Sequence, residues 1–244
     1  MKDNFSALAK EYSKYRPAYP NDMVAYILSF VKEKNCALDV ATGNGQVAAL
    51  FSTYFKEIYA TDISSKQLEH AVSKDNIFYS RQPAEATDFN DKQFDLITVA
   101  QAIHWFDFDV FYKEAYRIMK PEGVIAVMGY GLLQTNSESD KIISRFYHDI
   151  VGPYWDAERR YLDENYKTIP FPFNEIYTDR NFVNTFTWDF EQLAGYLQTW
   201  SAVQHYKEEK GKNSFSLIEE ELKISWENSD KQVTFPLLLR IGKL

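Results

Sequence analysis

Two glycines and two acidic residues at defined spacing are the part of this 244-residue chain best suited to chemistry. Gly43 and Gly45 lie in the segment 41–45, just after an apolar stretch that holds Asp39. Because glycine has no Cβ, such a loop lets the backbone approach a ligand closely. Asp62 follows Gly45 by 17 residues, a spacing typical of an acid that binds a ribose diol. The pattern indicates a nucleoside-containing ligand.

The glycine segment alone does not decide which nucleoside cofactor binds. Residues 43–48, GNGQVA, also fit the dinucleotide pattern of NAD enzymes. Asp39 favours another ligand, because a carboxylate just ahead of the glycines repels a pyrophosphate and suits a cation such as an ammonium or a sulfonium. An NAD-type oxidoreductase stays open as the alternative at this point.

The elements that must position these residues are short apolar strands that alternate with amphipathic helices. Strands are expected at 37–41, 57–61, 76–80, 94–100 and 124–128. Helices are expected to start near Asn21, Gly45, Ser64 and Asp107. The strands are continuously apolar, which is typical of a parallel sheet covered on both faces. The sequence therefore predicts a doubly wound α/β fold, whose ligands bind beyond the carboxyl ends of the strands.

The second half of the chain has a different character, because aromatic residues become dense after Tyr130. Helical patterns occupy 137–150, 155–166, 189–206 and 214–228, and strand patterns occupy 182–188 and 232–241. Residues 131–206 are expected to form an aromatic-rich cap or insertion. The last strand is expected to return to the sheet, and Pro236 within it favours an edge position.

Composition excludes several classes of protein. The net charge is −8 and no basic run is present, so binding to a nucleic-acid backbone is not expected. One cysteine, Cys36, allows neither an intramolecular disulfide nor a cysteine-rich metal site. No apolar run approaches the ~18 residues of a membrane span. We expect a cytoplasmic protein with no metal and no membrane partner, and the sequence does not indicate its oligomeric state.

An ordered series of motifs carries a family resemblance. The strings LDVATGNG, ATDIS, PAEATDF, FDLITVAQAIHWFDFD and KPEGVIAV resemble class I S-adenosylmethionine (SAM)-dependent methyltransferases. More narrowly, FSALAKEYSKYRPAYP and AQAIHWFD are similar to the trans-aconitate-methyltransferase-like (methyltransferase type 11) group. The resemblance implies a Rossmann-like, mostly parallel seven-stranded sheet with an antiparallel edge strand. It implies a SAM-binding core at 1–130 with a lid at 1–20, the cap at 131–206, and a helix and strand at 207–244 that complete the sheet.

The same resemblance implies roles for individual residues. Asp39 with Ala41, Gly43 and Gly45 would hold the methionine portion of SAM, and Ala100 and Gln101 would line it. Asp62 would bind the ribose, with Ile63, Ala84 and Glu85 beside the adenine. Residues that would cover the cofactor are Tyr12, Tyr15 and Arg16, with Arg16 a partner for its carboxylate. Tyr15, Trp105 and Phe106 are the candidate walls of an acceptor pocket.

Two positions depart from the family pattern. Ala41 stands where the first glycine of the loop is usual, which predicts a backbone conformation there that tolerates a Cβ. Pro83 stands where an acid usually precedes the Ala-Glu pair, so the contact to the adenine amino group must come from Glu85, a neighbour or water.

The function that follows is methyl transfer from SAM to a small-molecule acceptor, with release of S-adenosylhomocysteine. A carboxylate or thiolate acceptor needs no base, whereas a hydroxyl or an amine does, and His104 is then the candidate general base. Two alternatives remain at this point: the NAD-type oxidoreductase, and a methyltransferase-like protein that binds SAM without turnover.

Overall fold

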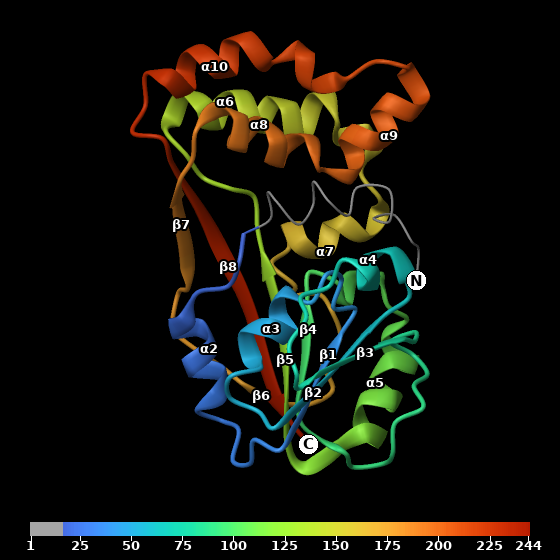
Figure 1. Ribbon diagram of the computed structural model, residues 1–244. Helices are drawn as coiled ribbons and strands as arrows, with labels where there is room; N and C mark the ends of the chain where they lie inside the picture. The colour runs from blue at the N-terminus through green and yellow to red at the C-terminus, as the bar shows by residue number, and fades with distance from the viewer. Residues whose placement is uncertain (1–16) are drawn as a thin grey trace.

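A twisted sheet forms the centre of the computed structural model, which describes residues 17–244 (Figure 1). Its strand order is β3-β2-β1-β4-β5-β8-β6, and β7 pairs with β8. The five parallel strands are β1 Cys36–Val40, β2 Glu57–Asp62, β3 Ile77–Arg81, β4 Phe94–Ala100 and β5 Met119–Tyr130. The antiparallel strands are β6 Asn174–Ile176, β7 Val183–Thr187 and β8 Gln232–Lys243. The expected doubly wound, mostly parallel fold is confirmed, with the short β6 as a strand that the sequence did not predict.

The continuously apolar strands are buried on both faces of the sheet. All of β1 is buried, and so are six of the seven residues of β4. Side chains alternate between two apolar clusters, so that Ala37 packs on one face and Leu38 on the other. Helices α2 Asn21–Leu28 and α3 Gln46–Phe51 pack on the first face, and α5 Phe108–Ile118 packs on the second.

Side-chain caps fix where the helices after β2 and β4 begin. The Ser64 hydroxyl accepts a hydrogen bond from the Gln67 amide and starts α4 Ser65–Glu69. The Asp107 carboxylate accepts one from the Val110 amide and starts α5. Both caps were expected from the sequence, because serine and aspartate satisfy amide groups that a helix leaves unpaired.

A layer of helices lies beyond the end of the sheet at which the parallel strands finish (Figure 1). It contains α6 Ser137–Arg145, α8 Phe190–Gln198, α9 Ser201–Lys210 and α10 Glu219–Glu227. Its interior is aromatic: the Phe146 ring stacks on Trp200 at 5.8 Å, and Phe215 packs edge-on against Phe146. A hydrogen bond between the hydroxyls of Ser139 and Ser225 joins α6 to α10. The short helix α7 Arg160–Asp163 lies between this layer and the sheet.

The expectation that Pro236 marks an edge strand is wrong. Strand β8 has β5 on one side and β6 and β7 on the other. Pro236 lies where the ladder with β5 ends, since the last paired residues are Tyr130 and Leu237. Its carbonyl accepts from the Gly131 amide at 3.0 Å, so its missing N–H falls on the side where that ladder stops. The proline therefore costs the sheet no hydrogen bond along its paired length.

Within residues 17–244, no helix is long and apolar enough to cross a membrane.

Candidate active site

The segment 41–45 connects β1 to α3 through three residues with left-handed backbone. Their φ angles are +53° at Ala41, +57° at Gly43 and +78° at Gly45. The expectation of a Cβ-tolerant conformation at Ala41 is wrong, because this region costs a residue with a Cβ about 1–2 kcal/mol. Backbone hydrogen bonds hold the segment in place, from the Thr42 amide to Thr61 and from the Gly45 amide to Thr42. The loop keeps its shape even where its first glycine is replaced.

The Asp39 carboxylate lies beneath this loop and is 2% exposed. One oxygen accepts hydrogen bonds from the Thr42 hydroxyl and the Ala48 amide, and the other accepts from the Thr98 hydroxyl at 2.7 Å. Burial raises the pKa of Asp39 to about 6, although these hydrogen bonds oppose the shift. Asp39 thus joins β1 to the loop, to α3 and to β4. Its contact with the methionine portion of a cofactor stays a prediction.

Asp62 meets the glycine loop at the neighbouring strand end. One carboxylate oxygen accepts from the Gly43 amide at 2.9 Å, and the other accepts from the Ser64 amide at 2.8 Å. The two residues that the sequence linked only by spacing are therefore in direct contact. Ile63 follows as a half-buried residue at the start of the next turn.

The space around Gly43 differs from that around Gly45, so the two positions require glycine for different reasons. A Cβ on Gly45 would stand 2.0 Å from the Tyr79 hydroxyl, which itself donates to the Val72 carbonyl. A Cβ on Gly43 would meet nothing closer than a Gln67 side-chain oxygen at 4.0 Å. Packing within the described residues explains Gly45 and does not explain Gly43. The bare backbone of Gly43 is what a close approach by a ligand requires.

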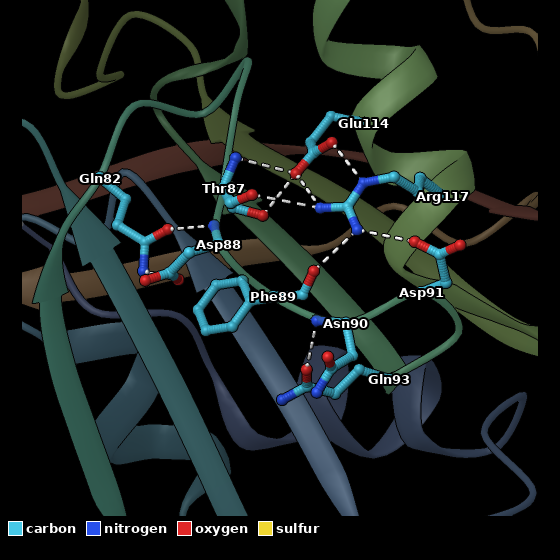
Figure 2. Close-up of polar contacts among 9 residues, drawn as sticks. All are labelled: Gln82, Thr87, Asp88, Phe89, Asn90, Asp91, Gln93, Glu114 and Arg117. Atoms are coloured by element: carbon cyan, nitrogen blue, oxygen red, sulfur yellow. Dashed lines mark hydrogen bonds and ion pairs between the residues drawn. The ribbon is translucent and has the colours of Figure 1, made fainter.

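The segment that holds Ala84 and Glu85 is fastened to α5 by a network that the motifs did not indicate (Figure 2). The Arg117 guanidinium donates to both oxygens of Glu114, to the Asp91 carboxylate and to the carbonyls of Thr87 and Phe89. Glu114 also accepts from the Thr87 amide at 2.8 Å. Partial burial raises the pKa of Glu114, but the hydrogen bonds from Arg117 and Thr87 outweigh burial and lower it. The only hint in the sequence is the i, i+3 spacing of Glu114 and Arg117.

Ala84 is buried in this segment, and Glu85 is half-buried. A Glu85 carboxylate oxygen accepts from the Asp107 amide at 3.3 Å, at the start of α5. Their contacts with an adenine ring stay predictions.

The exit of β4 brings several candidate residues together. Gln101 has a φ of +53°, and its side-chain amide donates to the Tyr130 carbonyl at 3.0 Å, next to the half-buried Ala100. The half-buried Trp105 ring lies 4.9 Å from the His104 ring. Phe106 is buried and packs against Phe111 at 4.8 Å. Whether Trp105 and Phe106 line an acceptor pocket stays a prediction.

His104 is buried, and its Nδ1 lies 3.2 Å from the Tyr166 hydroxyl. Burial, with a contribution from the charge of Arg159, lowers the pKa of His104 to about 3. The ring is therefore neutral at pH 7 and binds a proton weakly. This geometry suits a hydrogen-bonding role more than that of a strong base.

Tyr166 lies against the candidate residue His104, and the sequence did not indicate it. It is fully buried, and its backbone lies in the left-handed region, with a φ of +59°. Arg240 donates to its carbonyl at 3.0 Å, and its ring covers Gly129, where a Cβ would stand 2.7 Å away. A helical pattern was expected to continue to this position, but α7 ends at Asp163. Strained backbone that the surroundings enforce is frequent at functional sites.

Three of the expected residues, Tyr12, Tyr15 and Arg16, lie outside the described part of the chain.

The fold and the strand-end geometry together define the class. A doubly wound sheet in the order 3-2-1-4-5, a glycine loop after β1 and an acid at the end of β2 form a class I methyltransferase core. Comparisons with known proteins agree: the family model described as a methyltransferase domain matches residues 38–127.

Similar proteins extend this match to the whole chain. A Dictyostelium discoideum protein described as a methyltransferase is 30% identical over 250 residues, covering 99% of this chain and 95% of that protein. A solved structure from Anaeromyxobacter dehalogenans, described as a type II methyltransferase, has 31% identity and a TM-score of 0.85, covering 94% of this chain and 98% of that one. The ubiquinone/menaquinone biosynthesis C-methyltransferase UbiE of Pseudoalteromonas translucida is 33% identical over 130 residues, covering 49% of this chain and 50% of the relative.

The chain belongs to the class I SAM-dependent methyltransferase family, and SAM is its cofactor. The comparisons do not favour the NAD-type oxidoreductase or the SAM-binding protein without turnover. The narrower resemblance to the trans-aconitate group stays a prediction.

A first prediction separates ligand approach from backbone strain at Gly43. Gly43→Ala and Gly211→Ala should each lower the free energy of unfolding by about 1 kcal/mol, because both glycines have φ near +60°. A Cβ on Gly211 would meet no described heavy atom within 4 Å, and this glycine lies far from the loop in sequence, so it is the matched control. Only Gly43→Ala should weaken SAM binding, by about tenfold or more. Urea unfolding and titration calorimetry measure the two effects, and equal SAM affinity in both variants contradicts the assignment.

A second prediction concerns the network in Figure 2. Arg117→Gln removes two ion pairs, with Glu114 and Asp91, and several hydrogen bonds, and it should cost about 1–3 kcal/mol of stability. It should also speed amide exchange in residues 82–93 and weaken SAM binding. Arg145→Gln is the control, because its pair with Glu221 is solvent-exposed and contributes about 0–1 kcal/mol. Unchanged exchange in 82–93 despite lower stability contradicts this role for Arg117.

Proposed function

We propose that this protein transfers the methyl group of SAM to a small-molecule acceptor bound between the exit of β4 and the helical layer. The observation that carries the proposal is the direct contact of Asp62 with the backbone of Gly43, which brings two predicted cofactor elements to one point. The helical layer supports it, because it lies beyond the same end of the sheet (Figure 1).

The residues at the strand ends fit SAM. The Gly43 backbone has the space that a ligand requires, and two buried carboxylates, Asp39 and Asp62, provide negative charge near a cationic cofactor. We infer that the 41–45 loop holds the methionine portion, Asp62 the ribose, and Ala84 and Glu85 the adenine. When bound, SAM supplies an activated methyl group.

The protein then acts mainly by positioning. Holding a nucleophile in line with the methyl group at ~3–3.5 Å can supply much of the rate. Around the exit of β4, aromatic rings such as Trp105 and Tyr166 surround His104 and help exclude water. His104 stays neutral near pH 7, so it can orient the acceptor through a hydrogen bond without holding a charge.

A small acceptor is consistent with the chain and with one relative. The net charge of −8 disfavours a nucleic acid. By its name, the relative from Pseudoalteromonas translucida acts in ubiquinone/menaquinone biosynthesis, and thus on a small molecule. We further propose that the helical layer selects the acceptor, over a core at 1–130. Helices α6 and α8 and the first part of α9 come from residues 131–206, the expected cap, whereas α10 comes from 207–244. Strands β6 and β7, which also lie within 131–206, pair with β8. The cytoplasm is the proposed location.

A third prediction tests the cofactor. SAM and S-adenosylhomocysteine should raise the melting temperature of the wild-type protein, and NAD should not. Asp62→Ala should remove this rise while the protein stays folded. Because Asp62 also holds the Gly43 and Ser64 amides, the ligand-free melting temperature of the variant should fall as well. A folded wild-type protein that neither sulfur nucleoside stabilises would falsify the proposal.

A fourth prediction concerns pH. The pKa of Asp39 is raised to about 6 by burial, so its carboxylate is protonated below that pH. A bound cation favours the ionised form, so SAM binding below pH 6 releases a proton. The affinity for SAM should therefore rise between pH 5 and pH 7 by up to about tenfold and then level off. Calorimetry should show a flatter profile in Asp39→Asn, and an identical profile in that variant contradicts the electrostatic role.

A further inference from the structure

The turn that leads into α7 carries an arginine whose charge is compensated by one half-exposed carboxylate. Arg159 ends the turn Ala157–Arg159, and its side chain is 18% exposed. Its Nε donates to the Tyr147 hydroxyl at 2.7 Å. The guanidinium lies over the Trp155 ring at 4.6 Å and the Tyr147 ring at 5.3 Å. Among the described residues, these contacts fix the orientation of the guanidinium plane. They leave its two terminal nitrogens without a hydrogen bond.

Within residues 17–244, the Nη1 and Nη2 atoms of Arg159 have no hydrogen-bond partner. Nε forms a 3.7 Å ion pair with Asp163, but this carboxylate is half-exposed and already accepts a 2.6 Å hydrogen bond from the Tyr147 hydroxyl. Arg117 and Arg240 are different, because every nitrogen of each guanidinium donates to a carboxylate or a carbonyl. A largely buried cation with two free donors is costly unless it meets an anion.

The position of Arg159 links it to the proposed reaction site. Its turn packs against the segment Ile103–Trp105, directly after β4. The charge of Arg159 reaches His104, where it contributes to the lowered pKa of the imidazole. His104 in turn lies against Tyr166. The cofactor contacts proposed above come from other segments, namely 41–45, Asp62 and 84–85.

We propose that Arg159 binds an anionic group of the methyl acceptor, so that the acceptor is an acid whose carboxylate or phosphate meets the free edge of the guanidinium. The inference rests on the proposed function, because it assigns the acceptor side of that same site. The neutral His104 ring can add one N–H donor beside the guanidinium. Two parallel hydrogen bonds from Arg159 would fix the orientation of the acid. The anion is the anchoring group, and the atom that receives the methyl group is left open.

Binding to the protein saturated with S-adenosylhomocysteine tests this proposal. The probes are benzoate, succinate and phenyl phosphate, each with a neutral counterpart (benzamide, succinamide and phenol), titrated at constant ionic strength. At least one anion should bind and its neutral counterpart should not. Arg159→Gln should weaken that binding by about 10- to 100-fold. It should leave the affinity for S-adenosylhomocysteine within about twofold.

Two further variants complete the design. Arg160→Gln removes the exposed neighbouring arginine, which donates to the Tyr161 hydroxyl, and should leave anion binding unchanged. Arg159→Lys keeps the charge without the planar fork and should bind the anion with intermediate strength. It also keeps the test decisive if Arg159→Gln does not fold.

Several outcomes overturn the assignment. They are wild-type binding to no anion of the set, equal binding of the neutral counterparts, and full anion binding by a folded Arg159→Gln or an unweakened Arg159→Lys. Loss of S-adenosylhomocysteine affinity in Arg159→Gln, with anion binding retained, would show that the arginine serves the cofactor carboxylate instead. Failure of the wild-type protein to bind S-adenosylhomocysteine is a separate result, because it removes the proposed function itself.

Discussion

The hydrogen bonds of the buried Asp39 carboxylate are the interactions on which the arrangement of the strand ends depends. The carboxylate lies at the end of the central strand β1 and accepts hydrogen bonds from the loop, from the first turn of α3 and from β4. An acid so deeply buried is costly unless such donors surround it. The same donors fix the shape of the 41–45 loop, which in turn presents the Gly43 amide to Asp62. One buried group therefore sets the relative position of three strand ends.

Two arginines hold irregular segments that the sheet itself does not fix. Every guanidinium nitrogen of each arginine donates a hydrogen bond. Arg117 attaches the 82–93 segment to α5, and Arg240 attaches the turn around Tyr166 to β8 while it pairs with Glu175. Both draw carbonyl oxygens of irregular backbone into ordered contacts. Such segments otherwise have few regular hydrogen bonds, so side chains must supply the missing partners. Each arginine therefore fixes an irregular segment to a regular element of the fold.

Most of the sheet could be predicted from the sequence because local patterns determine it. Apolar runs bounded by glycines, serines and aspartates gave β1 to β5, and the caps at Ser64 and Asp107 are local hydrogen bonds. The spacing of Asp62 from the glycines indicated a shared ligand site, but the hydrogen bond between Asp62 and the Gly43 amide is a finding of the structure. The left-handed backbone of Ala41 and Tyr166 could not be predicted, because long-range contacts impose it against local preference. The same holds for Pro236, whose tolerance depends on where a neighbouring strand ends.

In the proposed site, the acidic groups and the basic group lie in different places. This separation bears on where a cofactor and an acceptor would each bind. The carboxylates of Asp39 and Asp62 contact the 41–45 loop, whereas the guanidinium of Arg159 lies on the turn that packs against 103–105. A cationic cofactor and an anionic acceptor would each be attracted to a different part of the same site, and each would be repelled from the other part. His104 is neutral at pH 7, so it adds no charge to either part of the site. Opposite charges in the two parts of the site would hold the cofactor and the acceptor in separate places, before any group acts as an acid or a base.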